Sequence, residues 1–397
     1  MSEREIPTSK AMTEITNAIQ ALGLTARVRY VGESYWVAIA ELYDKDKKLI
    51  ESGAGKGPDA VVGAMAESLE HYGTFHCQQL QRTNLSCGTI AGQHDVHCDG
   101  ILASLPNCDE RLECFRLTAL DDKRELFVPC ALLQPNFNES DTGVQEGRYL
   151  SRYASNSGIA FGCTKAEALL HGTLEVMERH LLSRFFLAVC AIQPAMDLYA
   201  PSKALLTEAL LDHSYALEAA KKLQIIIVKD ESGVYFSVAL PKTGPGEMHI
   251  SAIGSGCSLS ICTAVQRAVT EQLQSSALYD ITEEISDRKV FDFLSTSYAL
   301  KNLIDFAPVK NLKLQTLEPI PTHLASTVAQ QLALLQENLH TRDRTIFYRT
   351  VAEYANTNIV IQTYIPGLDR FNIIRNGQRV APQYILLNGA NTPGIGD

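Results

Sequence analysis

Three stretches of the chain share one pattern, in which glycines precede a run of apolar positions at helical spacing. The pattern predicts helices near residues 58–72, 164–184 and 260–279, each with a face of alanine, valine, methionine or leucine. Each stretch places two polar residues seven and ten positions after an alanine: Glu67 and Glu70, Glu175 and Glu178, and Glu271 and Gln274. Because residues three apart lie on the same side of a helix, we expect three similar helices that present these groups alike.

The paired acids are the unusual feature of these helices. Two carboxylates about 6 Å apart repel by roughly 3 kcal/mol at an effective dielectric near 20. A helix therefore keeps such a pair most readily where water surrounds it or where a cation lies between the two groups. One pair is common on a solvated face, but the recurrence indicates a shared acidic pocket. Hard cations with oxygen ligands are the ions that such a pocket binds.

The central helix has a clear predicted start. Thr164 predicts an N-cap, and Glu167 three residues later gives a capping-box arrangement. A shorter amphipathic helix is predicted over residues 8–23, with Thr8 or Ser9 as its cap and the glycine at its end as a stop signal.

The remaining pattern alternates between strands and helices without a regular rhythm. Strands are predicted in 26–52, with a hairpin turn at the DKDKK stretch, and in 110–135, 224–241 and 346–368, and further helices near 203–223 and 325–340. No Ser/Gly/Pro-rich tract or charge block divides the chain. We expect an α+β (mixed α/β) fold and a single domain over residues 1–397, with 1–52 leading into a core over 53–397.

Composition narrows the class of protein. The chain has 397 residues, 46% hydrophobic and 20% charged, with a net charge of −10, which argues against a nucleic-acid partner. Its longest apolar run, residues 185–192, is too short to span a membrane. The ten cysteines form no CxxC pair, and the N-terminal residues contain no hydrophobic signal segment. We therefore expect reduced thiols and a cytoplasmic protein.

Several familiar site motifs are absent or weak. The GAGKG stretch lacks the spacing of a P-loop or of a dinucleotide fingerprint, and Lys56 within it is interpreted as a loop residue. His94, His97 and Cys98 could indicate zinc, but no second pair of ligands follows at a suitable spacing. A polar loop is the favoured interpretation there, and a calcium- or zinc-binding structural protein remains an alternative.

The segment GIAFGCTKAEALLHGTLEVMERH, residues 158–180, resembles the YcaO family of ATP-dependent enzymes that modify peptide backbones. The first acidic helix resembles the Gly-Lys-Gly segment and Glu-x2-Glu element of that family, and the third resembles its Arg-x3-Glu element at Arg267 and Glu271. The N-terminal IPTSKAMTEITN is similar to the family's opening, and IPGL at 365–368 to its close. The resemblance therefore spans nearly the whole chain.

The resemblance implies a YcaO-like domain with sheets and helices around a central pocket for ATP and Mg²⁺. The implied magnesium ligands are Glu67, Glu70, Glu175, Glu178 and Glu271. The implied nucleotide contacts are Lys10, Asn17, Glu167, Arg179, Arg267 and Gln274. Four of these residues, Glu178, Arg179, Arg267 and Glu271, are the expected catalytic groups.

The basic residues also have simpler interpretations. Arg179 is placed to pair with Glu175 four residues away, and Arg267 is placed to pair with Glu271 likewise, which would be worth a few tenths of a kcal/mol each on an exposed helix. Lys10 on its own is typical of a solvated lysine.

Three features depart from the family pattern. His71 stands where an arginine is usual, and Cys163 stands where a nucleotide-contacting asparagine is common. The closing NGANTPGIGD lacks the Pro-x-Pro-x-Pro tail of members that form azolines. ATP use is therefore a firmer expectation than any particular reaction.

The family chemistry implies a peptide substrate. A nucleophile adds to the amide carbon, and phosphorylation makes the amide oxygen a leaving group. Side chains of cysteine, serine or threonine give azolines, sulfide gives a thioamide, and an amine gives an amidine. Cyclodehydration of a ribosomally made peptide is the first hypothesis, and a thioamide or a translation-associated modification is a version of it. A non-catalytic nucleotide-binding scaffold is the second hypothesis, and the calcium- or zinc-binding structural protein is the third. The implied partner is a leader-binding ThiF-like or TfuA-like protein, and a homodimer is compatible.

Overall fold

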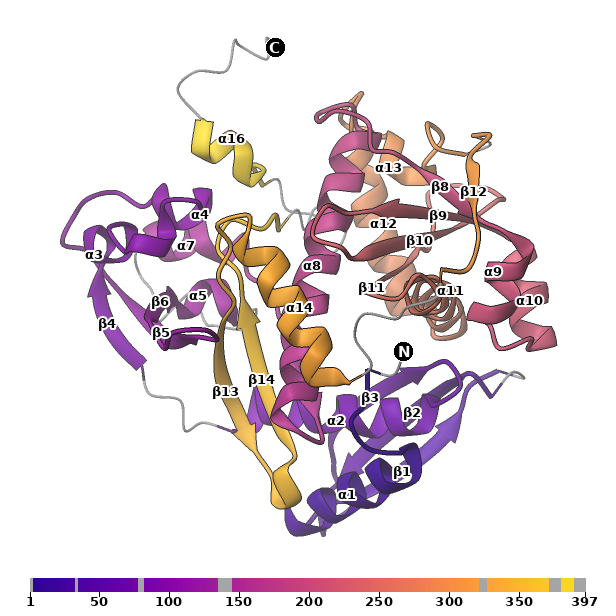
Figure 1. Cartoon of the computed structure of the whole chain (residues 1–397), viewed down its shortest axis with the longest axis horizontal. Helices are drawn as coiled ribbons and strands as arrows, with labels where there is room; N and C mark the ends of the chain where they lie inside the picture. The colour runs from indigo at the N-terminus through magenta and orange to yellow at the C-terminus, as the bar shows by residue number, and fades with distance from the viewer. Residues whose placement is uncertain are drawn as a thin grey trace.

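The computed structural model describes residues 3–32, 35–77, 82–134, 145–310, 312–320, 327–370 and 380–388. Its described part is a mixture of helices and three separate antiparallel or mixed sheets, which confirms the predicted α+β class (Figure 1).

The first sheet is formed by the N-terminal part of the chain. It has the order β1-β2-β3, with bounds Thr25–Tyr30, Val37–Tyr43 and Leu49–Lys56. The helices α1 (Thr8–Ala21) and α2 (Ala60–His76) pack on it through one apolar cluster. The predicted hairpin turn is present between β2 and β3, where Asp44 Oδ1 accepts a hydrogen bond from Lys48 N at 2.9 Å.

Helix α1 begins and ends close to the predicted positions, but its cap differs. Pro7 occupies the N-cap position and supplies no side-chain hydrogen bond, so the predicted cap at Thr8 or Ser9 is wrong. Thr8 Oγ1 instead donates to Asp59 Oδ2 at 3.3 Å. At the other end Gly23 adopts a φ of +72°, a conformation that favours glycine and stops the helix as predicted.

The second sheet has five strands in the order β11-β10-β9-β8-β12. Their bounds are Gly254–Ser258, Tyr235–Pro241, Leu223–Lys229, Tyr199–Pro201 and Gln315–Leu317. The helices around it are α9 (Lys203–Ala209), α10 (Ser214–Lys221), α11 (Ile261–Ala277), α12 (Ile281–Ser295) and α13 (Asn302–Asp305). Most of this part occupies the upper right of Figure 1.

The third sheet has the order β4-β5-β13-β14-β7, and β6 pairs with β5. The bounds are β4 Arg82–Ser86, β5 Arg111–Ala119, β6 Glu125–Pro129, β7 Ile159–Gly162, β13 Phe347–Glu353 and β14 Ile359–Tyr364. Short helices flank it: α3 Cys87–Ala91, α4 Gly100–Ala103, α5 Cys130–Leu133, α7 Gln145–Ser151, α16 Gln383–Asn388, and the 3₁₀ turns η1 His94–Val96 and η2 Ala355–Thr357. Longer α14 spans Val328–His340.

The long central helix α8 (Lys165–Val189) joins the two larger sheets, because it contacts β7 and β14 on one side and β11 on the other. It continues beyond the predicted end at residue 184 since its last turns are apolar: Phe185 and Phe186 are buried in the largest core cluster. The apolar residues that follow residue 184 in the sequence therefore form the last turns of α8.

The repeated sequence pattern corresponds to three strand–helix units, β3–α2, β7–α8 and β11–α11. In each unit a strand glycine lets the following helix pack directly on the strand. A Cβ atom would lie 1.8 Å from Ala60 O if added at Gly55, and 2.1 Å from Ala268 O if added at Gly254. Glycine is therefore required at these positions by close approach of the backbone.

The three units also contact one another in a cycle. Helix α2 contacts β7, α8 contacts β11, and α11 contacts β3. Each helix thus packs on its own strand and touches the strand of the next unit. This closed arrangement points the same part of all three helices toward one central space.

Candidate functional site

The space between the three units is a pocket of about 360 Å³. We call it the acidic pocket. All five predicted metal ligands line it: Glu67, Glu70, Glu175, Glu178 and Glu271. Three other predicted site residues, Glu167, Arg179 and Arg267, line it as well. The predicted convergence of distant acidic helices is therefore present in the structure.

The carboxylates on α2 lie close to other acids. Burial raises the pKa of Glu70 well above its usual value, and the charges of Glu175 and Glu67 raise it further. Burial also raises the pKa of Glu67, although His71 and Lys56 oppose this effect. The Glu67 side chain stays 39% exposed, which places it at an accessible wall of the pocket. Burial is therefore the main reason why the charged forms of both carboxylates are disfavoured.

Backbone amides hold both of these carboxylates in place. Ala54 N donates to Glu67 Oε2 at 3.2 Å, and Phe161 N donates to Glu70 Oε2 at 3.0 Å. On the opposite wall, Ser255 Oγ donates to Glu178 Oε1 at 2.6 Å. The acids therefore have fixed positions provided by β3, β7 and β11.

Two cations from α8 and β3 balance part of this charge. Arg179 lies 3.6 Å from Glu175, which is the helical pair that the spacing predicted. Burial alone would lower the pKa of Arg179, but Glu175, Glu178 and Glu271 together raise it. Lys56 Nζ lies 2.6 Å from Glu271 Oε2. The interpretation of Lys56 as a loop residue is wrong, because it ends strand β3 and faces the pocket.

Arg267 does not form the predicted pair with Glu271. Its guanidinium instead donates to the carboxylate of Glu3 and, at 2.9 Å, to Cys257 O. Burial would lower the pKa of Arg267, and the charges of Glu3 and Glu178 outweigh this and raise it. Arg267 therefore remains charged and keeps its head group in the pocket.

The N-terminal arm and one histidine complete the pocket, and sequence reasoning missed both. Glu3 is 7% exposed, and its Oε2 lies 4.0 Å from His171 Nε2. Burial, together with the charges of Arg267 and Arg4, lowers the pKa of His171 to about 4, so its imidazole is neutral at pH 7. The spacing could have identified His171, which precedes Glu175 by one helical turn. No local signal marks Glu3.

The start of α8 is built from a partial capping box. Thr164 Oγ1 accepts from Glu167 N at 3.2 Å as predicted, whereas the Glu167 carboxylate accepts from Cys163 N at 3.2 Å. Burial raises the pKa of Glu167 to about 7, with Arg4 opposing the effect. Cys163, one of the departures from the family pattern, is buried and also lines the pocket.

Three predicted nucleotide contacts do not line the acidic pocket. Lys10 and Asn17 are exposed on α1, whose pocket-facing residues are Ala11 and Ile15. Gln274 lines a neighbouring cavity, where its side chain donates to a backbone oxygen at 2.9 Å. The spacing of Lys10 and Asn17 alone did not reveal which face of α1 is turned inward.

The residues present fit a hard cation held together with phosphates. Within the described residues, no three acidic, histidine or cysteine side chains lie close enough to hold a metal by themselves. Magnesium commonly takes only one or two carboxylates and completes its shell with phosphate oxygens and water. The convergence of Glu67, Glu70, Glu175, Glu178 and Glu271 on one pocket is the observation that favours an added positive charge.

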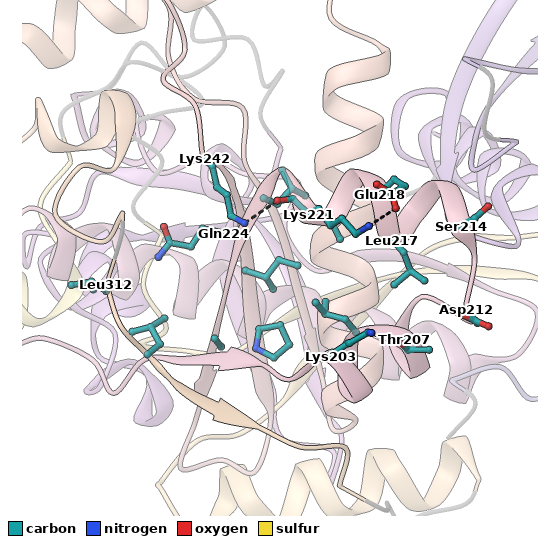
Figure 2. A pocket seen from close by; sticks show the side chains of 17 residues that line it. Lys203, Thr207, Asp212, Ser214, Leu217, Glu218, Lys221, Gln224, Lys242 and Leu312 are labelled. Carbon is teal, nitrogen blue, oxygen red and sulfur yellow. Dashed lines mark hydrogen bonds and ion pairs between the residues drawn. The ribbon is translucent and has the colours of Figure 1, made fainter.

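A cavity larger than the acidic pocket lies elsewhere in the described structure. It has a volume of about 980 Å³ and is lined by α9, α10 and the adjoining edge of β9 (Figure 2). Lys221 and Lys242 at its rim already donate to Glu218 and to the Lys221 carbonyl. None of the predicted site residues lines it. Size alone therefore does not identify the site.

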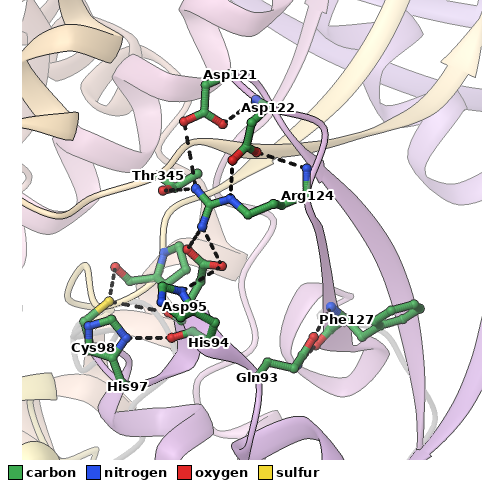
Figure 3. Close-up of polar contacts among 11 residues, drawn as sticks. Gln93, His94, Asp95, His97, Cys98, Asp121, Asp122, Arg124, Phe127 and Thr345 are labelled. Atoms are coloured by element: carbon green, nitrogen blue, oxygen red, sulfur yellow. Dashed lines mark hydrogen bonds and ion pairs between the residues drawn. The ribbon is translucent and has the colours of Figure 1, made fainter.

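The zinc alternative is not supported by the positions of its three residues (Figure 3). His97 Nδ1 lies 2.6 Å from His94 O, and Cys98 Sγ lies 3.5 Å from Asp95 O. Asp95 itself is paired with Arg124 at 2.9 Å. These contacts stabilise a turn, and within the described residues no group of three such side chains could hold a metal ion, which agrees with the favoured interpretation as a polar loop.

One family model and several solved structures match this chain. The family model for YcaO cyclodehydratases, described as ATP- and Mg²⁺-binding, matches residues 53–369. No curated protein matches the chain in sequence. None of the helices in the described ranges combines the length and the apolarity needed to cross a membrane.

Several solved structures share the fold. A heterocyclase in complex with substrate and cofactor has a TM-score of 0.67 at 15% identity; the match covers 93% of this chain and 54% of that one. The chain thus spans about half the length of that heterocyclase. YcaO from Methanopyrus kandleri, bound with AMPPCP and Mg²⁺, has a TM-score of 0.62 at 14% identity and 95% coverage of both chains. The E. coli microcin synthetase McbBCD complex gives 0.55 at 14% identity, with 86% of each chain covered.

Proposed function

Because the chain belongs to the YcaO family, whose cofactors are ATP and Mg²⁺, we propose that it activates a peptide-backbone amide by phosphorylating the amide oxygen. The observation that carries this proposal is the acidic pocket, in which six carboxylates from three helices meet three arginines and one lysine. Phosphoryl transfer depends mainly on positioning and charge neutralisation, which this set of side chains supplies.

The pocket residues divide by charge. Glu67, Glu70, Glu175, Glu178 and Glu271 hold magnesium directly or through water. Arg179 and Arg267 bind phosphate oxygens, because charge-assisted hydrogen bonds from guanidinium groups are strong and directional. When bound, ATP supplies the phosphoryl group and Mg²⁺ neutralises its charge. Glu178 and Glu271, with the two arginines, adjoin the reacting groups.

Four further residues are proposed to contact the nucleotide, and only one of them, Glu167, lines the acidic pocket. Glu167 lies in the pocket wall and can accept from the nucleotide as a carboxylate or donate to it when protonated. Gln274 lies just outside the wall, and Lys10 and Asn17 lie on the exposed side of α1. A role for Lys10 or Asn17 requires the side chain to reach around the helix.

We propose cyclodehydration of cysteine, serine or threonine to an azoline as the reaction. The side chain adds to the amide carbon, and the amide oxygen departs as phosphate, so that the peptide loses one water. The microcin synthetase and heterocyclase likenesses favour this choice over a thioamide or another modification. The closing NGANTPGIGD segment bears on this choice, and all but its first residue lie outside the described residues.

The domain organisation, the partner and the compartment of the protein are also proposed here. The whole chain forms one catalytic domain, which acts on a peptide with a ThiF-like or TfuA-like partner, alone or as a homodimer. All ten cysteines lie in the described residues and are free thiols, which supports a reducing cytoplasm.

Mass spectrometry of a reconstituted reaction tests this function. Purified protein, ATP, Mg²⁺, a candidate precursor peptide and its partner should give a peptide lighter by one water per modified residue. Glu178→Gln should lower the rate by about 100-fold, because it removes charge at the reacting groups. The exposed residue Glu353 provides the control Glu353→Gln.

The Glu178→Gln variant also distinguishes an enzyme from a nucleotide-binding scaffold. If Glu178→Gln abolishes ATP hydrolysis but preserves the cellular function of the gene, the protein acts as a nucleotide-binding scaffold. Exchange of oxygen for sulfur in the peptide would instead identify thioamide formation.

A further inference from the structure

A second cavity, of about 750 Å³, lies directly beside the acidic pocket. We call it the outer cleft. The two cavities share four residues in their walls: Glu67, Arg179, Ser255 and Glu271. A molecule in the outer cleft therefore meets carboxylates and a guanidinium that also face the acidic pocket. The volume of the cleft falls within the usual range for small-ligand sites.

The walls of the outer cleft are suited to a peptide. Leu182 and Phe186 of α8, Ile253 before β11 and Val290 of α12 give it an apolar lining. Helix α11 supplies the wall between this lining and the shared residues. Apolar side chains of an extended segment can be buried here while its backbone approaches the acidic pocket.

One buried hydroxyl in the cleft lacks a partner. Ser251 is 6% exposed and lines the cleft, and its Oγ makes no hydrogen bond within the described structure. Its backbone N–H is already used, because it donates to Ile304 O at 2.8 Å. A buried hydroxyl is normally paired. The free Oγ therefore indicates a ligand that brings its own donor or acceptor, as a peptide bond does.

Two further acids line the cleft in addition to the shared residues. Glu283 is exposed, Asp287 is half-buried, and both lie on α12. Tyr279 Oη donates to Asp287 Oδ2 at 3.1 Å and fixes this carboxylate. Among the described residues that line the cleft, Arg179 is the only lysine or arginine, and it lies at the shared wall. Glu283 and Asp287 thus line the cleft without a lysine or arginine of their own in its described lining, because Arg179 also faces the acidic pocket.

We propose that the outer cleft binds the acceptor peptide, and that Glu283 and Asp287 select peptides with a lysine or arginine side chain near the residue to be modified. The backbone amide lies at the shared wall, apolar neighbours contact Leu182 and Phe186, and a peptide group pairs with Ser251. The assignment of the bound peptide as the acceptor rests on the function proposed above. The charge preference does not, because it follows from the cleft alone.

Binding of labelled peptides tests the preference directly. The probes are three fluorescein-labelled peptides, Gly-Leu-Cys-Lys-Leu-Gly and its versions with glutamine or glutamate in place of lysine. Fluorescence anisotropy with the full chain, with and without AMPPCP and Mg²⁺, gives each affinity. The lysine peptide should bind roughly three- to tenfold more tightly than the glutamine peptide, and the glutamate peptide most weakly, as expected for two half-exposed ion pairs.

Two double variants of α12 locate the effect. Glu283→Gln with Asp287→Asn should abolish the preference. Glu284→Gln with Asp292→Asn removes the same charge from the same helix at positions outside the cleft and should preserve it. Leu182→Trp should weaken all three peptides alike, because the larger side chain fills the cleft.

Each other outcome overturns the inference. Equal affinities for the three peptides, no peptide binding, or an equal loss of preference in both double variants would each contradict a charge-selective cleft. Binding of AMPPCP with Mg²⁺ to the protein is measured in a separate titration. Failure of the nucleotide to bind would contradict the proposed function, whereas nucleotide binding without a peptide preference would contradict only this inference.

Discussion

The carboxylate of Glu3 contacts the guanidinium of Arg267, although 264 residues separate them in the sequence. The same carboxylate accepts a hydrogen bond from Ser258 Oγ at 2.5 Å and lies near His171. The N-terminal arm therefore places an anion against one of the two arginines proposed to bind phosphate. A phosphate oxygen and the Glu3 carboxylate would compete for the same donors.

This competition predicts the effect of Glu3→Gln. Removing the negative charge should free Arg267 and tighten binding of AMPPCP with Mg²⁺ roughly three- to tenfold, since a single charge-assisted contact is lost from the nucleotide-free state. Titration calorimetry measures the change. Glu41→Gln, on β2 and outside the pocket, is the control. Weaker nucleotide binding in Glu3→Gln would mean that Glu3 positions Arg267 rather than competing for it.

Because strand glycines pack directly against helices, replacing one of them by alanine should lower stability strongly. In Gly55→Ala the new Cβ would lie 1.8 Å from Ala60 O and 2.4 Å from Ala64 N, so β3 and α2 must separate. The free energy of unfolding should fall by about 3 kcal/mol or more. Gly244→Ala meets no atom within 4 Å and should change it by less than about 0.5 kcal/mol. Equal effects in urea denaturation would contradict this account of the repeat.

The sequence predicted the parts of the site that lie on the repeated units. Spacing within a helix decides which side chains share a face, so Glu67 with Glu70, and Glu175 with Glu178, could each be assigned to one face of a helix without coordinates. The glycines before each helix had a packing role that the pattern alone did not specify. The recurrence predicted that the three helices share a pocket, but how they meet, through contacts with the strands of neighbouring units, required the structure.

Other parts of the site depend on contacts between distant segments. The arm before α1 brings Arg4 into the pocket wall and Glu3 against Arg267, and no local pattern marks such a long-range contact. Lys56 was misjudged because its glycine neighbours resemble a loop, whereas they are the positions where β3 touches α2. Lys10 and Asn17 were chosen by resemblance, and the burial of Ala11 and Ile15 shows which face of α1 turns inward.

The buried carboxyl of Glu167 predicts a dependence of stability on pH. Its pKa is raised to about 7 in the folded protein from 4.5, so the folded state holds a proton there that the unfolded state has lost. Stability from this group is therefore present at low pH and decreases as the pH rises from 4.5 through 7.

Glu167→Gln should remove that dependence while preserving an acceptor for Cys163 N. Relative to the unmodified protein, the variant should gain about 3 kcal/mol in the free energy of unfolding between pH 5 and pH 8. Urea denaturation with EDTA and without nucleotide measures it. A difference between the two proteins that stays constant over this pH range would show that the carboxyl is not held neutral.

The central claim is that the acidic pocket binds nucleotide and magnesium together, and calorimetric titration of AMPPCP with Mg²⁺ or with EDTA tests it most directly. The nucleotide should bind at least about tenfold more tightly with Mg²⁺, and Glu70→Gln with Glu178→Gln should remove most of that difference, because the metal loses pocket ligands. Equal affinity with and without Mg²⁺, or an unchanged magnesium effect in the double variant, would contradict the claim.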